Sequence, residues 1–106
     1  MTEELKSPEK KGLDLDQRVL TIDKKEIPFQ NTPLTIRRAI KTAILTADMD
    51  KKSPEERYEA YKLAVKLETG SPTLTVEELV KIKKAVGITW YPETVGFIWD
   101  AIEQSK

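Results

Sequence analysis

Acidic residues supply the first pattern in the chain that could do chemistry. Four carboxylates fall at positions 1, 3, 9 and 12 of a calcium-binding loop, namely Asp48, Asp50, Glu56 and Glu59. Lys52, however, stands at the fifth position, where the loop needs an oxygen ligand, and Ser53 replaces the glycine that makes its sharp turn. A helix start at residues 53–56 explains the segment without a metal. We therefore expect no metal site here.

A catalytic carboxylate pair is the second possibility, because Glu77 and Glu78 are adjacent. Adjacent residues of a helix point about 100° apart, and Glu78 is explained by a capping box that begins at Thr75. The 106 residues contain no histidine and no cysteine, which excludes imidazole bases, thiol nucleophiles, disulfides and the usual nitrogen and sulfur metal ligands. Neither a G-x-S-x-G motif nor a glycine-rich phosphate loop is present. We expect a protein that is not an enzyme and has no cofactor.

Basic residues form a second chemical pattern. Arg37, Arg38 and Lys41 share the side of a predicted helix that lies opposite its apolar stripe, and they could bind an anionic partner. Such a face is usually only a solvated surface. The 18 basic and 18 acidic side chains balance, so no overall field concentrates nucleic acid on the protein. A nucleic-acid-associated regulator that uses these three residues is therefore the alternative function.

Two predicted helices joined near Gly87 have the outline of a DNA-reading helix-turn-helix. The second of them carries Glu93, Asp100 and Glu103, and no lysine or arginine before Lys106. Phosphates repel acidic side chains. We do not expect this helix pair to read DNA.

Aromatic residues concentrate near the end of the chain. Four of the seven fall within ten positions: Trp90, Tyr91, Phe97 and Trp99. Trp99 has the spacing of a core residue, whereas Phe97 points the other way, where it is either buried under the N-terminal segment or part of an interface. Exposed aromatic residues are typical binding anchors. We predict a protein-binding site at Phe97, Trp90 and Tyr91, called the aromatic corner below.

The first half of the chain predicts a tail, a hairpin and a helix. Residues 1–12 are almost free of apolar side chains and should form a mobile tail. Val19–Ile22 and Ile27–Phe29 favour β structure and are joined by a polar connection of hairpin length. Thr32-Pro33 has the residue types of a helix start. The apolar stripe of this helix is Ile36, Ala39, Ile40, Ala43, Ile44 and Ala47.

Three more helices are predicted from their caps. A capping box at Ser53 starts the first, Gly70 ends it, and its two apolar strips indicate a helix sandwiched between neighbours. Thr75 starts the next with a second capping box, and Gly87 is its expected stop. Pro92 opens the last helix.

Four segments of the chain carry a resemblance: D-K-K-E-I-P-F, E-R-Y-E-A-Y-K-L-A, T-V-E-E-L-V-K-I-K-K-A-V-G and W-Y-P-E-T-V-G-F-I-W-D-A-I-E. Together, over about residues 18–104, they resemble small proteins encoded by tailed bacteriophages and prophages. Members of that group have no assigned activity. The resemblance therefore implies a viral source and a binder of a host or virion protein, with no functional residue to transfer.

These patterns predict a single α+β domain at residues 13–106, with an N-terminal β-hairpin packed on a bundle of about four helices. We expect a non-enzymatic protein–protein interaction module that binds a host enzyme or a virion component through the aromatic corner, with self-association as a further possibility. No apolar run approaches the roughly 18–20 residues of a membrane span, and the first residues lack the apolar segment of a signal peptide. The expected location is the cytoplasm, that of the host cell for a viral protein.

Overall fold

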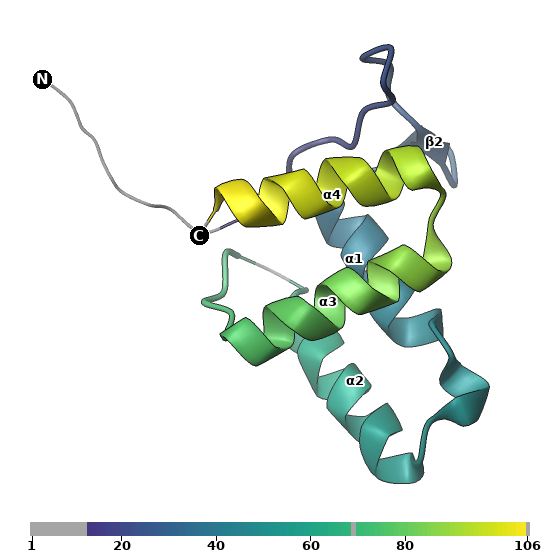
Figure 1. Ribbon diagram of the computed structural model, residues 1–106, viewed down its shortest axis with the longest axis vertical. Helices are drawn as coiled ribbons and strands as arrows, with labels where there is room; N and C mark the ends of the chain where they lie inside the picture. The colour runs from purple at the N-terminus through teal and green to yellow at the C-terminus, as the bar shows by residue number, and fades with distance from the viewer. Residues whose placement is uncertain (1–12, 69, 106) are drawn as a thin grey trace, which may run out of the picture.

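One short hairpin and four α-helices make up the computed structural model, which describes residues 13–68 and 70–105 (Figure 1). The elements are β2 (Pro28–Phe29), β3 (Thr32–Pro33), α1 (Ile36–Thr46), the 3₁₀ turn η1 (Met49–Lys51), α2 (Pro54–Lys66), α3 (Val76–Thr89) and α4 (Pro92–Gln104). The predicted α+β, mostly helical fold is confirmed. The tail predicted at residues 1–12 lies outside the described residues.

The hairpin lies later in the chain than the sequence predicts. β2 pairs antiparallel with β3, and Phe29 stands opposite Thr32. The turn residues Gln30 and Asn31 both have positive φ, 52° and 71°. Positive φ at both positions is typical of two-residue turns whose twist matches that of the strands. The prediction that Thr32-Pro33 starts the first helix is therefore wrong, because the hairpin holds both residues.

The predicted strand Val19–Ile22 is reduced to an isolated bridge between Leu20 and Glu26. A tight turn closes it, in which the Thr21 N–H donates to Lys25 O at 2.8 Å. No longer ladder forms among these described residues, because the chain just before them pairs with the start of α1 instead.

Residues 13–19, here called the N-terminal arm, run along the start of α1. The Ile36 N–H donates to Gln17 O at 2.9 Å, and the Arg37 N–H donates to Leu15 O at 2.8 Å. The first N–H groups of a helix have no partner within the helix. The arm therefore satisfies two amides of α1 that would otherwise need water.

Hydroxyl side chains cap three of the four helices. Thr35, and not Thr32, is the N-cap of α1. Both predicted capping boxes are confirmed, Ser53 with Glu56 on α2 and Thr75 with Glu78 on α3. The helix starts were readable because each box places two complementary side chains three residues apart.

Two glycines do not end helices as predicted. α3 runs through Gly87 to Thr89. A Cβ at Gly87 would lie 3.5 Å from Cζ2 of Trp99, so the indole packs against the helix there. α2 ends at Lys66, and Gly70 adopts its positive φ of 72° in the loop beyond.

α1 is the central element of the core. α2 and α3 both pack on it, and α4 packs on α3 (Figure 1). The predicted stripe of α1 is buried along its whole length, which confirms that prediction. The later helices add four fully buried side chains, Ile82 and Val86 from α3 and Ile98 and Ile102 from α4.

Several helical surfaces are more exposed than predicted. α2 is not sandwiched, because Tyr58 and Tyr61 are more than half exposed and stack on each other with ring centroids 6.4 Å apart. Val76 and Val80 of α3 are exposed, and Trp99, which has the spacing of a core residue, is 38% exposed. α2 is exposed because, among the described residues, α1 is the helix that packs extensively on it.

Replacing Gly96 with alanine should stabilise the protein. Gly96 lies on the exposed side of α4, and beyond its own helix backbone and chain neighbours no atom of the described residues lies within 4 Å of the position that its Cβ would take. Alanine is favoured over glycine inside a helix by about 0.5–1 kcal/mol. We expect the midpoint of thermal unfolding to rise by roughly 2–8 °C. Gly70→Ala is the matched control, because its surroundings are equally open but its φ of 72° strains alanine, so its midpoint should fall. A fall for Gly96→Ala contradicts the prediction.

Candidate protein-binding site

Trp90 of the aromatic corner ties the turn between α3 and α4 to the core. Its indole Nε1–H donates a hydrogen bond to Ala39 O of α1 at 3.0 Å. The ring meets Phe29 of β2 edge to face, with centroids 5.6 Å apart and an interplanar angle of 70°. A buried indole is stable when its N–H has a partner. Trp90 therefore packs within the molecule and is only partly accessible to another protein.

Phe97 and Tyr91 lie in different surroundings. Phe97 is partly buried and packs against the hydrophobic core. Tyr91, the N-cap of α4, is 81% exposed. Glu93 nearby accepts a hydrogen bond from the Ile22 N–H at 3.3 Å, so the loop before β2 reaches the start of α4. Among the three corner residues, Tyr91 presents most of its side chain to the outside.

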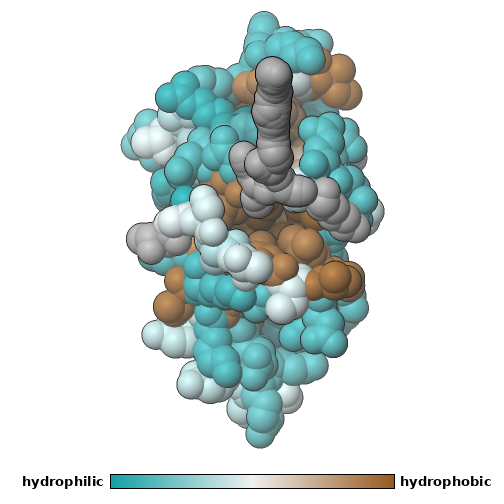
Figure 2. Space-filling view, turned by 90° about the vertical axis from the view of Figure 1, so that its left-hand side faces the viewer, coloured by the Kyte–Doolittle hydropathy of each residue, from teal (hydrophilic) through white to brown (hydrophobic). Residues whose placement is uncertain are grey.

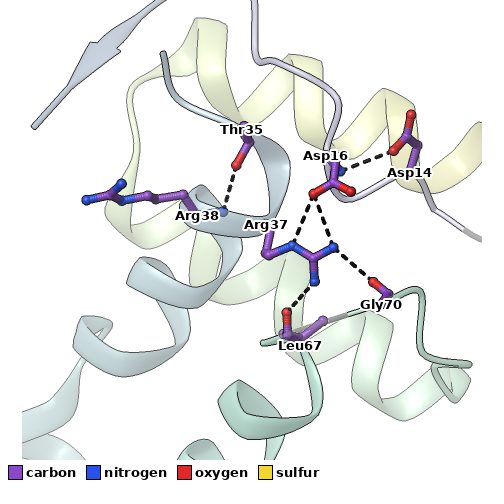
Figure 3. A network of polar contacts seen from close by, with 7 residues as sticks. All are labelled: Asp14, Asp16, Thr35, Arg37, Arg38, Leu67 and Gly70. Atoms are coloured by element: carbon purple, nitrogen blue, oxygen red, sulfur yellow. Dashed lines mark hydrogen bonds and ion pairs between the residues drawn. The ribbon is translucent and has the colours of Figure 1, made fainter. Parts of the chain in front are cut away.

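Arg37 joins three segments of the chain through its guanidinium (Figure 3). It donates to Leu67 O at 2.8 Å and to Gly70 O at 2.9 Å, both beyond the end of α2. It also donates to Asp16 Oδ1 of the N-terminal arm at 3.2 and 3.3 Å. The planar fork of arginine can reach several acceptors at once, which lysine cannot do. Its donors are thus engaged within the protein.

Arg38 and Lys41 also have partners within the chain. Arg38 is hydrogen-bonded to Gln30 and lies over the Phe29 ring, 5.2 Å from its centroid. Lys41 pairs with Glu68, and this contact holds the pKa of the Glu68 carboxyl below its ordinary value. Figure 3 shows the Arg38 side chain pointing away from the guanidinium network just described. The fold therefore does not gather the three cations around one anion site.

A groove that the sequence did not predict lies between α1, α2 and α3, with a volume of about 530 Å³. Six apolar residues line it and are called the groove floor: Ile44, Ala47, Ala60, Leu63, Ala85 and Ile88. Ten charged residues line it as well and are called the groove walls: Asp48, Lys52, Glu55, Glu56, Glu59, Lys62, Lys66, Glu78, Lys81 and Lys84. The floor runs from the buried side chain of Ile44 to that of Ile88, which is 48% exposed.

An ion pair joins the two walls at one end of the groove. Lys66, the last residue of α2, donates to the carboxylate oxygens of Glu78 on α3 at 2.8 and 3.1 Å. This contact and the backbone N–H of Thr75 hold the pKa of the Glu78 carboxyl below its ordinary value. Beyond this pair α2 and α3 diverge (Figure 1), and each of them packs on α1.

The walls differ in charge where they diverge. The α2 wall begins with Glu55 and Glu59, the second of which lies 3.6 Å from the ammonium of Lys62. The α3 wall carries Lys81 and Lys84, neither of which lies within 4 Å of a carboxylate of residues 13–68 and 70–105. The charge of Lys81 still acts across the groove, because with the Ser53 backbone N–H it helps to hold the pKa of the Glu56 carboxyl below its ordinary value. The groove is therefore acidic along the start of α2 and basic along the facing part of α3.

Exposed apolar residues also occur outside the groove. In the face that Figure 2 shows, hydrophobic residues reach the surface at mid-height, between hydrophilic residues above and below. Over the whole described surface, the large apolar residues that are exposed are Ile22, Leu45, Tyr58, Tyr61, Val65, Val76, Val80, Ile88, Tyr91 and Trp99. They are spread over every helix, so exposure alone does not select a binding site. The groove is distinguished by combining apolar side chains with a concave shape.

The segment with calcium-loop spacing, residues 48–59, forms a 3₁₀ turn followed by the first turns of α2. Asp48 has a positive φ of 48° and precedes η1, which leads into the capped start of α2. In the part of the chain that the structure describes, no three acidic side chains lie together in a way that could hold a metal ion. None of the helices described is both long enough and apolar enough to span a bilayer.

Arg37→Lys should destabilise the protein by about 1–3 kcal/mol, because lysine leaves carbonyl and carboxylate acceptors without their donors. Arg38→Lys is the matched control. Its side chain lies at the next position of the helix, is partly buried, and contacts Gln30 and the Phe29 ring. These contacts are fewer than those of Arg37, so we expect a smaller loss, below about 1 kcal/mol. Urea unfolding followed by circular dichroism measures both, with an unchanged slope against urea confirming an effect on stability. Equal losses in the two variants would contradict the assignment of Arg37 as a tie.

Acid should weaken the protein partly through Glu78. Its folded-state pKa lies below the ordinary 4.5. The ionised form therefore stabilises the fold above that value, and this contribution is lost as the pH falls through the folded pKa. We expect the free energy of unfolding to decrease from about pH 5 downward, and Glu78→Gln to make the decrease shallower. Glu77→Gln, at the adjacent position, should keep the slope of the original protein. A Glu78→Gln curve parallel to the original one rules this explanation out.

Comparison with known proteins identifies no relative of this chain. No protein-family model matches the chain, and neither the curated proteins nor the solved structures contain a significant match. The resemblance to phage-encoded proteins stays a prediction.

Proposed function

We propose that this protein is a non-enzymatic protein-binding module and that the groove between α1, α2 and α3 is its main binding site. The observation that carries the proposal is the groove floor, an apolar surface that opens between two diverging helices. Ile88, at one end of this floor, is an apolar residue that the described part of the chain leaves 48% exposed. Burying such surface against a partner is favourable by roughly 25 cal/mol per Å².

The composition of the groove also supports a protein partner. Protein interfaces combine an apolar centre with a polar rim, which is the arrangement of floor and walls here. Tyr91 of the aromatic corner is a second candidate contact, since it is the most exposed of the corner residues. The resemblance to phage-encoded proteins makes a host enzyme or a virion component the class of partner to test first.

The alternative function, a nucleic-acid-associated regulator, gains no support from the geometry. It depends on Arg37, Arg38 and Lys41, and each of them contacts other parts of the chain. Phosphate binding would have to break those contacts before it could gain from counterion release.

Affinity capture from nuclease-treated bacterial lysate tests the proposed function with three variants. Ile88→Asp places a charge on the groove floor. Val80→Asp places the same charge on a second exposed β-branched residue of α3, which lies outside the groove. Tyr91→Ala removes the exposed part of the aromatic corner. We expect a protein that the original chain and Val80→Asp retain and that Ile88→Asp loses at least about tenfold, since tenfold corresponds to only 1.4 kcal/mol.

The captured protein is then identified, purified and titrated directly against the same variants. Loss with Tyr91→Ala alone would move the site to the aromatic corner. Capture of nucleic acid without nuclease, abolished by an Arg37/Arg38/Lys41→Ala variant, would favour the alternative function. Absence of any protein that depends on the groove would overturn the proposal.

A further inference from the structure

We propose that the occupant of the groove is one amphipathic α-helix of a partner protein, with basic residues along its edge facing α2 and acidic residues along its edge facing α3. This inference rests on the proposed function and specifies the chemistry of the partner. Four properties of the groove support it, namely its position in the helix bundle, its length, its mixed lining and the charges of its walls.

The groove lies where one more helix could pack against α1, α2 and α3 at once. α1 supports α2 on one side and α3 on the other, and the Lys66–Glu78 pair joins these two helices at only one end. Helices pack with axes about 8–10 Å apart, so a helix placed between two diverging helices contacts both of them and the helix behind. An inserted helix would complete a bundle around the groove floor.

The length of the groove fits a short helix. Its lining residues extend from Glu55 to Lys66 on α2 and from Glu78 to Ile88 on α3. At 1.5 Å per residue each wall spans about 15 Å, which corresponds to roughly three turns of an inserted helix. Apolar side chains spaced three and four residues apart would then reach the floor from one face of that helix.

The lining argues for a peptide and against a small apolar ligand. Ten of the sixteen lining residues are charged. Sites for small ligands are lined predominantly by hydrophobic and aromatic side chains with few polar groups. An amphipathic helix matches a mixed lining, because its apolar face covers the floor while its polar edges meet the walls.

The charges of the walls define the edges of that helix. Lys81 and Lys84 lie one turn apart on α3, and no carboxylate of the described residues lies within 4 Å of either ammonium. Glu55 and Glu59 lie one turn apart on α2. Opposite charges across an interface favour one partner, and like charges disfavour others. A helix with two basic edges would meet repulsion at α3, and one with two acidic edges would meet it at α2.

Three synthetic helices of about 14 residues, four turns, test the inference. They share one leucine stripe and differ only in their edges, which are glutamate on one side and lysine on the other, lysine on both, or glutamate on both. Fluorescence anisotropy gives their affinities for the full chain, and amide shifts of the ¹⁵N-labelled protein locate the contact. We expect the mixed helix to bind about tenfold more tightly than either other helix, and to shift the amides of the groove floor.

Charge reversal in the protein provides the sharper control. Lys81→Glu/Lys84→Glu makes both walls acidic, so the preference should change from the mixed helix to the one with two lysine edges. Ile88→Asp should weaken the mixed helix at least about tenfold, while Val80→Asp should leave its affinity within about twofold. Val80 is 59% exposed and Ile88 is 48% exposed, and circular dichroism confirms that each variant is folded.

Each other outcome overturns the inference in a recognisable way. Equal affinities for the three helices, an unchanged order after charge reversal, or shifts outside the groove would exclude an edge-selective helix site. A dimer in sedimentation that Ile88→Asp dissociates would identify a second copy of this chain as the occupant. A lysate protein that depends on Ile88, combined with no binding of any helix, would leave the proposed function standing and exclude a helical partner.

Discussion

The burial of α1 is the constraint on which the rest of the structure depends. Its apolar stripe is buried from Ile36 to Ala47, and it is the surface on which both α2 and α3 pack. The carbonyl of Ala39 accepts the indole N–H of Trp90, which ties the turn between α3 and α4 to this helix. A helix of 11 residues is only about 16 Å long. It can hold two helices against itself without holding them against each other, and the groove follows from that arrangement.

Arg37 is the polar counterpart of this packing. The last carbonyls of a helix and the loop after it lack donors within the helix. The guanidinium supplies donors to Leu67 O and Gly70 O, and Asp16 of the N-terminal arm provides the compensating charge. The same arm supplies acceptors to the first amides of α1. Arg37 thus ties the end of α2 and the loop that follows it to α1 and to the N-terminal arm, close to the Lys66–Glu78 pair that closes one end of the groove.

Local features of the sequence predicted the fold where local interactions decide it. The capping boxes at Ser53 and Thr75 were readable because their partners are three residues apart, and the stripe of α1 because its period is helical. The sequence placed the hairpin too early in the chain, because the Gln30-Asn31 turn lacks the glycine that usually marks such a turn. Both residues nevertheless adopt positive φ. α3 continues through Gly87, where the indole of Trp99, twelve residues away, packs against it, and no local pattern contains that contact.

The candidate site shows why residue types are easier to read than shape. Glutamates and lysines at helical spacing, such as Glu59 and Lys62, have the pattern of a solvated helix face. Whether that face meets water or lines a groove depends on the angle between α2 and α3, which contacts with α1 determine. Trp90 is the opposite case, because its residue type suggested an available aromatic, yet its partner Ala39 lies 51 positions earlier. In a small helical domain, a concave site is therefore best sought between two helices that share a packed neighbour and separate from each other.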